Sequence, residues 1–519
     1  MAVKLSSFLC LLALINVACA ARQQQPFKYQ TESHGECQIQ RLQALEPTNQ
    51  IRAEAGSTDI WNHNEEQLKC AGATVIRHTI EPQGLLLPSY SNAPQLVYVI
   101  QGKGIQGVLL PGCPDTYQSG QSEFEQFQHG GRQGREEHGG RGWSRGEEQE
   151  GRGRGQGSQR FQDRHQKIRH FRAGDILAIP AGVSYWAYND GNEQLITVVL
   201  LDNTNFANQL DINPRRFYLA GSPQEEHQQR GRQQHGKQQG RWGSQGSDKN
   251  NVFSGFEIDW LSQVFNVDRN VIEKLQGQND QRGNIVRVQG GLQVIQPPHM
   301  TEHEQGRRGE SEWPRGQGER GHGGRRGRGD DDNGFEETLC NIRLRENIDD
   351  PERAAIYTPR GGRVSTINSF NLPVLSWLDL SAERGVLYQN GIIAPHYYSN
   401  AHSITYVTRG QARIQVVDDQ GQTVFDDVIR EGQLLVEPQN YVILKQALQD
   451  GYEYISFKTS DNAFRSTLAG RNSVFRGLPV GVIANAYQIS PEEAELLKFN
   501  RDETTVFQGQ RSSERIAVA

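Results

Sequence analysis

The chain of 519 residues has little sulfur and no long apolar run. It contains 2 methionines and 6 cysteines. No segment beyond residue 20 has the roughly 18 consecutive apolar residues of a membrane-spanning helix, so we expect a soluble mature protein. No Cys-x-x-Cys pair is present, which argues against a zinc site and against a dithiol redox motif. No Asn-x-Ser/Thr sequence is present either, so we expect no N-linked glycan.

The sequence also has little that suggests catalysis. It contains no Walker-type phosphate loop. Glycine is abundant, with 56 residues, and glutamine lies far above its usual share in globular proteins. The net charge of −6 shows that acidic residues balance the many arginines. A chain rich in amide and guanidinium nitrogen and poor in sulfur suits a nitrogen reserve.

The first twenty residues have the features of a secretory signal. Lys4 supplies a positive charge, residues 8–17 are mostly apolar, and residues 18–20 (ACA) are small. An apolar run of this length is too short to span a bilayer and is typical of a cleaved signal peptide. We therefore expect cleavage between Ala20 and Ala21 and entry into the secretory pathway.

Removal of the signal changes the cysteine count. Four cysteines stay in the mature chain: Cys37, Cys70, Cys113 and Cys340. An even number of cysteines in an oxidising compartment predicts two disulfides. Spacing alone leaves all three possible pairings open.

Three segments lack periodic apolar residues and consist mainly of Gly, Gln, Arg, Glu and His. They cover about residues 118–166, 222–249 and 277–334. Such sequences cannot bury enough apolar surface to offset the entropy of ordering, so we expect disordered surface loops. The third segment contains one patch that resembles ordered structure, GNIVRVQGGLQVI.

Short apolar runs of strand character lie between these segments. They occupy residues 95–100, 175–180, 194–201, 403–407, 412–417 and 433–437. Gly, Pro and Asn separate the runs at short intervals, as in an all-β barrel or jelly roll.

The two halves of the chain repeat each other. YSNAPQLVYVIQGKG (90–104) aligns with YSNAHSITYVTRGQA (398–412) without a gap, and RAGDILAIP (172–180) aligns with REGQLLVEP (430–438). Beyond each barrel-like region, VFNVDRNVIEKL (264–275) matches AYQISPEEAELL (486–497), and both predict amphipathic helices. Asp268 and Ser490 are the expected N-caps, and Ser490 begins a capping box. The repeating unit is therefore a β-barrel followed by helices.

The repeat resembles a known family. Residues 174–189, GDILAIPAGVSYWAYN, resemble the second cupin motif at every fixed position except the histidine, which is replaced by Tyr185. Residues 333–354, NGFEETLCNIRLRENIDDPERA, resemble the junction signature of the legumin-type 11S seed storage globulins. That family has two tandem cupin barrels, and each barrel is followed by a small helical domain. The resemblance covers nearly all of the mature chain except the low-complexity loops.

The resemblance implies a division of the chain into four parts. Residues 1–20 would be the signal, 21–276 the first barrel with its helices, 277–334 a variable linker, and 335–519 the second barrel with its helices. In such globulins a vacuolar asparaginyl endopeptidase cuts after the junction asparagine, here between Asn333 and Gly334.

The same resemblance implies how the cysteines pair and how the protein assembles. Cys113 would pair with Cys340 and so join the two chains after the cut, and Cys37 would pair with Cys70. The proprotein would form trimers with itself or with related globulin subunits, and the cut form would form hexamers. The protein would be a nitrogen and amino-acid reserve in seed protein-storage vacuoles, with no cofactor, no membrane and no nucleic acid as a partner.

A metal-dependent cupin enzyme, of the oxalate-oxidase kind, is the main alternative. Cupin enzymes hold their metal with a His-x-His pair, a glutamate and a later histidine. The corresponding positions here are Tyr90, Asn92, Gln95 and Tyr185 in the first barrel, and Tyr398, Asn400, Ser403 and Ile443 in the second. None of these is a strong ligand for a transition metal. His396 and His402 lie nearby in the sequence, but a packing or hydrogen-bonding role is the commoner one for such a pair.

Nucleic-acid binding is a second alternative. Residues 152–157 (RGRGQG) and 324–329 (GRRGRG) resemble the RGG segments of RNA-binding proteins. The surrounding tracts are rich in glutamate and poor in aromatic residues, and the secretory signal directs the chain away from nucleic acid. We therefore interpret them as solvated loops.

Overall fold

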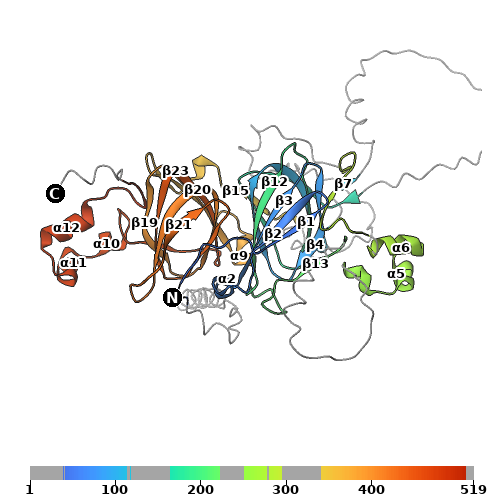
Figure 1. Cartoon of the computed structure of the whole chain (residues 1–519), viewed down its shortest axis with the longest axis horizontal. Coiled ribbons are helices and arrows are strands. Elements are labelled where there is room, and N and C mark those ends of the chain that lie inside the picture. The colour runs from blue at the N-terminus through green and yellow to red at the C-terminus, as the bar shows by residue number, and fades with distance from the viewer. Residues whose placement is uncertain are drawn as a thin grey trace, which may run out of the picture.

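The computed structural model describes residues 39, 41–113, 117–118, 164–221, 251–277, 280–294 and 340–509. These residues form two β-barrels that lie side by side, with helices at the two opposite ends of the molecule (Figure 1). The predicted fold of two tandem cupin barrels with helical additions is confirmed. No helix in the described residues is long and apolar enough to cross a membrane.

The first barrel consists of two antiparallel sheets. The strands of the larger sheet lie in the order β1 (Asn49–Ala53), β2 (Gly56–Ile60), β3 (Ala73–Ile80), β12 (Leu195–Asp202), β5 (Gln95–Gln101), β10 (Asp175–Ile179) and β15 (Arg345–Asn347). The strands of the smaller sheet lie in the order β13 (Arg216–Tyr218), β4 (Gly84–Ser91), β11 (Ser184–Tyr188), β6 (Lys103–Leu109) and β9 (Ile168–Arg172). A further strand, β14 (Ile285–Arg287), also pairs with β4. A separate ribbon joins β7 (Tyr117–Gln118) to β8 (Arg164–His165).

The second barrel is one continuous set of ten strands. They are β16 (Ile356–Thr358), β17 (Gly362–Ile367), β18 (Ser381–Leu387), β19 (Gly391–Tyr398), β20 (Ser403–Val417), β21 (Thr423–Arg430), β22 (Leu434–Glu437), β23 (Val442–Lys458), β24 (Arg465–Thr467) and β25 (Val506–Gln508). The runs predicted at 403–407 and 412–417 form the single strand β20, because its pairing with β23 continues past bulges near Arg409 and Gly410.

Helices follow each barrel and project away from it. After the first barrel come the 3-10 turn η2 (Val252–Gly255) and the helices α5 (Ile258–Phe265) and α6 (Arg269–Leu275); after the second come α10 (Val474–Gly477), α11 (Val480–Tyr487) and α12 (Pro491–Phe499). We call these two groups the helix arms. Three other short elements are α2 (Glu66–Ala71), α9 (Leu375–Leu378) and the 3-10 turn η3 (Pro351–Arg353).

The sequence predicts correctly where the last helix of each arm, α6 or α12, begins. Ser490 caps α12 with a complete capping box, as predicted. Asp268 is the N-cap residue of α6, although its side chain accepts no capping hydrogen bond. The helix predicted from residue 264 is divided, because Asn266 adopts a left-handed conformation (φ 52°) that ends α5.

One strand lies within the segment assigned to the variable linker, in the patch GNIVRVQGGLQVI that resembles ordered structure in the sequence. We placed residues 277–334 in a variable linker, but Ile285 to Arg287 form β14 and pair with β4 of the first barrel. This strand has a counterpart in β25, which follows the second helix arm and pairs with β19. The repeating unit is thus a barrel, a helix arm and a returning strand.

The two barrels also exchange segments. Leu45, which precedes the first barrel, forms a β-bridge with Leu434 of the second barrel. In the other direction, β15 lies beyond Cys340 in sequence but pairs with β10 of the first barrel. One buried apolar cluster includes residues from both barrels, among them Trp61 and Tyr406, whose rings are in edge-to-face contact. The division at residue 335 therefore does not separate two independent cores.

Candidate functional sites at the chain junction and in the barrel interiors

A disulfide joins Cys113 to Cys340 across 227 residues of sequence. Gln166 supports the turn that carries Cys113, since its side-chain amide donates to the Cys113 carbonyl (2.8 Å) and accepts from the amide of Leu110 (3.0 Å). The bond therefore connects a turn of the first barrel with the segment that leads to the second.

The segment that follows Cys340 is held against the first barrel. The amide of Ala178 donates to the Leu344 carbonyl (2.8 Å), and the β15 strand then pairs with β10. Arg345 forms an ion pair with the buried carboxylate of Asp175 (3.1 Å), and the Asn347 amide donates to the same carboxylate (2.9 Å). These contacts would persist whether or not the chain is continuous before Cys340.

Several predicted sites lie outside the described residues. They are Ala20 and Ala21 at the signal boundary, Asn333 and Gly334 at the processing bond, and Cys37. Most of the three low-complexity segments and both RGG-like tracts also lie outside them. Cys70 is described and is disulfide-bonded.

In the first barrel, two of the four positions that correspond to cupin ligands come together around an arginine. Arg216 donates to the hydroxyl of Tyr185 (3.1 Å) and to the side-chain oxygen of Gln95 (3.4 Å). The pKa of His78 lies well below its ordinary value, because burial and the Arg216 charge both disfavour the protonated ring. A guanidinium at this place repels a metal cation.

The side chains at the other two positions of the first barrel, Tyr90 and Asn92, make contacts away from Arg216. Tyr90 stacks on Phe217, with ring centroids 4.9 Å apart. The Asn92 side chain donates to Asn208 (3.0 Å) and accepts from the backbone amide of Arg215 (2.8 Å). Both residues have structural contacts and do not contribute to a common site.

The second barrel contains a buried network of charges. Lys445 on β23 forms an ion pair with Glu437 at the end of β22, with Nζ 2.6 Å from Oε1. The side chains of Lys445 and Glu437 are 1% and 0% exposed. Lys458 lies at the other end of β23 and donates to the hydroxyls of Ser403 (2.6 Å) and Ser456 (3.0 Å). Two lysine side chains thus occupy the barrel in which a cupin enzyme would hold a cation.

The electrostatics of this network follow from its burial. Burial alone raises the pKa of Glu437, but the attraction of Lys445 and Lys458 outweighs it, and the net pKa lies below the ordinary value. Burial lowers the pKa of Lys458 well below its ordinary value. Ser403 and Lys458 resemble a serine–lysine nucleophile pair. They are 0% and 2% exposed, however, so a substrate cannot reach them without opening the barrel.

The remaining candidates in the second barrel are not brought together as ligands. The hydroxyl of Tyr398 donates to Glu383 (2.5 Å), and Asn400 accepts from the amide of Phe464 (2.8 Å). Ile443 is buried and pairs in register with His396.

The two histidines that we weighed occupy different environments. His396 is buried beside the lysine network, whereas His402 is half-buried and accepts from the amide of Gln439 through Nδ1 (3.2 Å). Among the described residues no group of three His, Cys, Asp or Glu side chains is arranged to hold a metal ion.

Sequence analysis missed the three charged residues of this network, Glu437, Lys445 and Lys458. Their only signal is a charge in or beside an otherwise apolar strand. That signal does not show whether the charge points into the barrel, because β23, which carries both lysines, changes its register against β20 between them.

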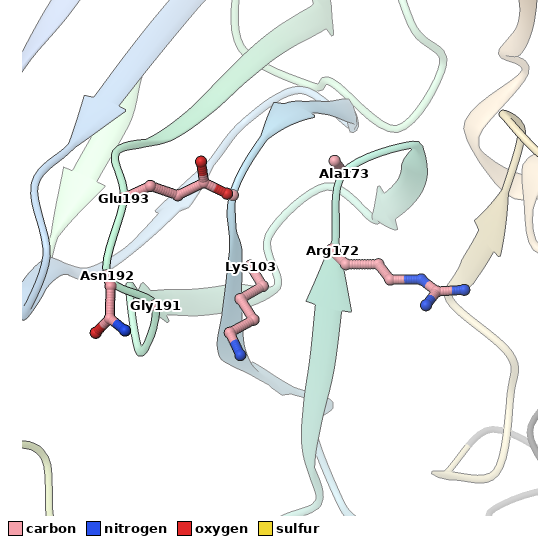
Figure 2. Close-up of a pocket in the computed structure, with 7 residues that line it drawn as sticks. Lys103, Arg172, Ala173, Gly191, Asn192 and Glu193 are labelled. Carbon is pink, nitrogen blue, oxygen red and sulfur yellow. The ribbon is translucent and has the colours of Figure 1, made fainter. Parts of the chain in front are cut away.

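A pocket of about 410 Å³ lies at one end of the first barrel. The turns that follow β5, β9 and β11 form its wall, which consists of Gly102, Lys103, Arg172, Ala173, Gly191, Asn192 and Glu193. Figure 2 shows that the charged ends of Lys103, Arg172 and Glu193 point in different directions. These three charged groups therefore do not converge on one point in the pocket.

The buried His396 gives a testable pH dependence. Burial lowers its pKa from 6.5 to about 4, and the Lys445 charge acts in the same direction. Below pH 6.5 the unfolded chain gains a proton that the folded protein does not take up until about pH 4, so stability falls as the pH falls through this window. A shift of this size corresponds to about 3 kcal/mol at most. We expect His396→Gln to flatten the dependence of unfolding free energy on pH between 6.5 and 4.

Urea unfolding at a series of pH values measures this slope. His402→Gln is the matched control and should retain the wild-type slope. His78 contributes separately in both proteins, so the slope should decrease without vanishing. An unchanged slope in His396→Gln would show that this ring titrates normally.

The comparisons with known proteins agree with this geometry. A family model described as cupin matches residues 42–225 and 346–495, that is, both barrels. The 11S globulin seed storage protein 1 of Carya illinoinensis is 50% identical over 540 residues, which cover 98% of this chain and 97% of that protein. The chain belongs to the 11S globulin family of seed storage proteins.

Two further comparisons extend the match. An 11S globulin of Juglans nigra is 51% identical to this 11S globulin over 533 residues, covering 98% of this chain and 97% of that one. The crystal structure of pumpkin seed globulin superposes with a TM-score of 0.71 at 40% identity, covering 92% of this chain and 100% of the other. The predicted family and the predicted seed storage role are thereby confirmed.

Proposed function

We propose that this 11S globulin is deposited in seed protein-storage vacuoles as a nitrogen and amino-acid reserve and is degraded at germination. The observation that carries the proposal is its 50% identity, over 98% of the chain, to a seed storage protein. The sealed charge network of the second barrel supports a role without catalysis or a bound metal. Immunogold labelling of mature and germinating seeds tests the proposal. We expect dense labelling of the vacuoles that falls as free amino acids rise, and labelling of cell walls alone would contradict it.

The route to the vacuole is part of the proposal. The chain enters the secretory pathway and is cleaved between Ala20 and Ala21, which removes residues 1–20. An asparaginyl endopeptidase then cuts between Asn333 and Gly334. The products are a chain of residues 21–333 and a chain of residues 334–519.

The disulfide supports this processing scheme. Cys113 lies in the first product and Cys340 in the second, so their bond joins the two chains after the cut. We propose that Cys37 is the partner of Cys70, which would place the second disulfide entirely within the first chain. A protein with this arrangement stays intact through the cut.

Assembly is proposed from the helix arms. In α5, Trp260 is 67% exposed and Val264 is 77% exposed, and in α12 Leu496 and Leu497 are 62% and 58% exposed. Apolar side chains gathered on helix faces at both ends of a molecule indicate interaction surfaces. We propose that the arm of one subunit binds the opposite arm of the next, which closes a ring of three. After the cut, two rings stack through the face that carries the disulfide.

A charge on the first arm tests this assembly. Val264→Asp places a carboxylate in the proposed interface, where burial without a partner is costly. We expect the proprotein to change from trimer to monomer at micromolar concentration in sedimentation velocity. Gln263→Asp adds the same charge at the neighbouring exposed position and should remain a trimer. A trimeric Val264→Asp protein would mean that α5 lies outside the interface.

A further inference from the structure

The chain contains two Asn-Gly bonds, but only one of them lies at the junction between the two products. The other, Asn390–Gly391, connects β18 to β19 in the second barrel. An endopeptidase that recognises asparagine meets the same two residues at both places. We propose that Asn390–Gly391 is a latent cleavage site for this enzyme, which strand β25 keeps closed in the folded barrel. This inference rests on the proposed processing function.

The local backbone is unsuited to cleavage. Asn390 has φ 60°, and the amide of Gly391 donates to the carbonyl of Tyr388 (2.8 Å), which closes a tight turn at the surface. A protease requires its target bond in an accessible, extended segment. A closed turn with a left-handed residue at the target position cannot lie in a cleft that binds extended chains.

The target carbonyl is also engaged. The amide of Gly509, directly after β25, donates to the carbonyl oxygen of Asn390 (2.9 Å). A hydrolase must bind this oxygen with its own donors as negative charge develops on it. Gly391 pairs in register with Gln508 of β25, so the residue that follows the bond belongs to the sheet.

Gly391 is required by the packing on its other side. A Cβ atom at Gly391 would lie 2.2 Å from the carbonyl oxygen of Gly361. The Asn-Gly pair therefore has a structural reason to be here, and the barrel retains a sequence that the processing enzyme recognises. What protects it is the conformation, not the sequence.

Strand β25 is the element that can release the bond. It has three residues and is held mainly by the buried side chains of Val506 and Phe507. Short terminal strands open locally at lower cost than strands in the middle of a sheet. Detachment of β25 frees the Asn390 carbonyl and leaves the turn without its neighbour.

Cleavage at this bond has a distinctive product. Hydrolysis adds the hydroxyl of water to the Asn390 carbonyl carbon and its proton to the Gly391 nitrogen, which breaks the C–N bond. The chain of residues 334–519 then becomes 334–390, which contains Cys340, and 391–519, which contains no cysteine. The second fragment is released on a denaturing gel without reductant, unlike the uncut chain.

The experiment treats the proprotein, residues 21–519, with purified asparaginyl endopeptidase. Val506→Asp detaches β25 by placing a charge at a fully buried position. Truncation after Gln508 removes only the Gly509 donor and the residues beyond it. Gln508→Asp, at an exposed position of the same strand, is the matched control. Sedimentation of each variant as a trimer shows that the rest of the molecule is folded.

We expect the wild type and Gln508→Asp to be cut at Asn333 only. Val506→Asp and the truncated chain should release residues 391–519 at least tenfold faster than the wild type, and adding Asn390→Gln should abolish that fragment. A peptide of residues 385–396 should be cut, because it has the sequence without the fold.

The inference is overturned if the peptide stays intact, if the wild type is cut equally fast at both bonds, or if both β25 variants resist at Asn390. Failure of the proposed processing gives a different result. In that case the peptide is cut, but Asn333–Gly334 remains intact in the wild-type proprotein.

Discussion

Replacing Lys445 with methionine is expected to lower the free energy of unfolding by about 3–5 kcal/mol, the range for breaking a buried ion pair from one side. Methionine fills a similar volume but leaves Glu437 charged at a position that is 0% exposed. The hydroxyl of Thr405 still donates to Glu437 (2.8 Å) and Lys458 still attracts it, but neither replaces the ion pair with Lys445. Urea unfolding of the proprotein, followed by tryptophan fluorescence, measures the loss.

Two controls separate the charge from the packing. The double variant Lys445→Met with Glu437→Leu removes both charges and should recover most of the lost stability. Arg413→Met breaks the pair with Asp426 on the barrel surface, where Arg413 is more than half exposed, and should change little. If the double variant is as unstable as Lys445→Met, then the loss comes from packing and not from an unpaired carboxylate.

The barrels themselves could be predicted from local sequence. The run at 95–100 becomes β5, the run at 175–180 becomes β10, and the run at 194–201 becomes β12, each within one or two residues. These strands have strong apolar signals and turn residues at both ends. The helix arms were predicted for the same reason, because Ser490 and its capping box lie next to a periodic helix.

The exchange between barrels could not be predicted in this way. Leu45 bridges Leu434, nearly 400 residues away, and β15 has only three residues and a polar sequence, Arg-Glu-Asn. Short segments of this kind carry no periodic signal, and their partners follow only from the closed barrels. The sequence did show that Tyr185 and Ile443 replace cupin histidines. It did not show which charged residues lie inside each barrel, because that depends on which strands pair.

The exchange of segments between the barrels limits what the proposed cut at Asn333 would change. After a cut at Asn333, the first barrel still holds β15 of the second chain, and the second barrel still holds Leu45 of the first. The side chains of Arg77 and Tyr406 are also hydrogen-bonded across the two barrels (3.0 Å). Hydrolysis therefore removes a covalent constraint without separating the barrels, as expected of a cut that alters assembly and leaves the fold intact.

Replacing Asn333 with glutamine is therefore expected to abolish processing and hexamer formation while leaving the trimer intact. The extra methylene moves the side-chain amide out of the register that an asparagine-specific pocket reads, and such pockets discriminate strongly through hydrogen bonds. After incubation with the endopeptidase, the wild type should run as one band without reductant and two with it, because the bond from Cys113 to Cys340 survives. The variant should run as one band in both conditions and sediment as a trimer.

Two matched variants test whether the loss of processing in Asn333→Gln is specific to this bond. Asn390→Gln makes the same substitution at the other Asn-Gly bond and should be processed like the wild type, since that bond lies in a closed turn. Cys340→Ser should give two bands even without reductant, yet remain one particle in native buffer, because β15 and Leu45 still link the barrels. If Asn333→Gln still yields hexamers that contain two chains, another bond is the one cut during assembly, and the function assigned to Asn333 is wrong.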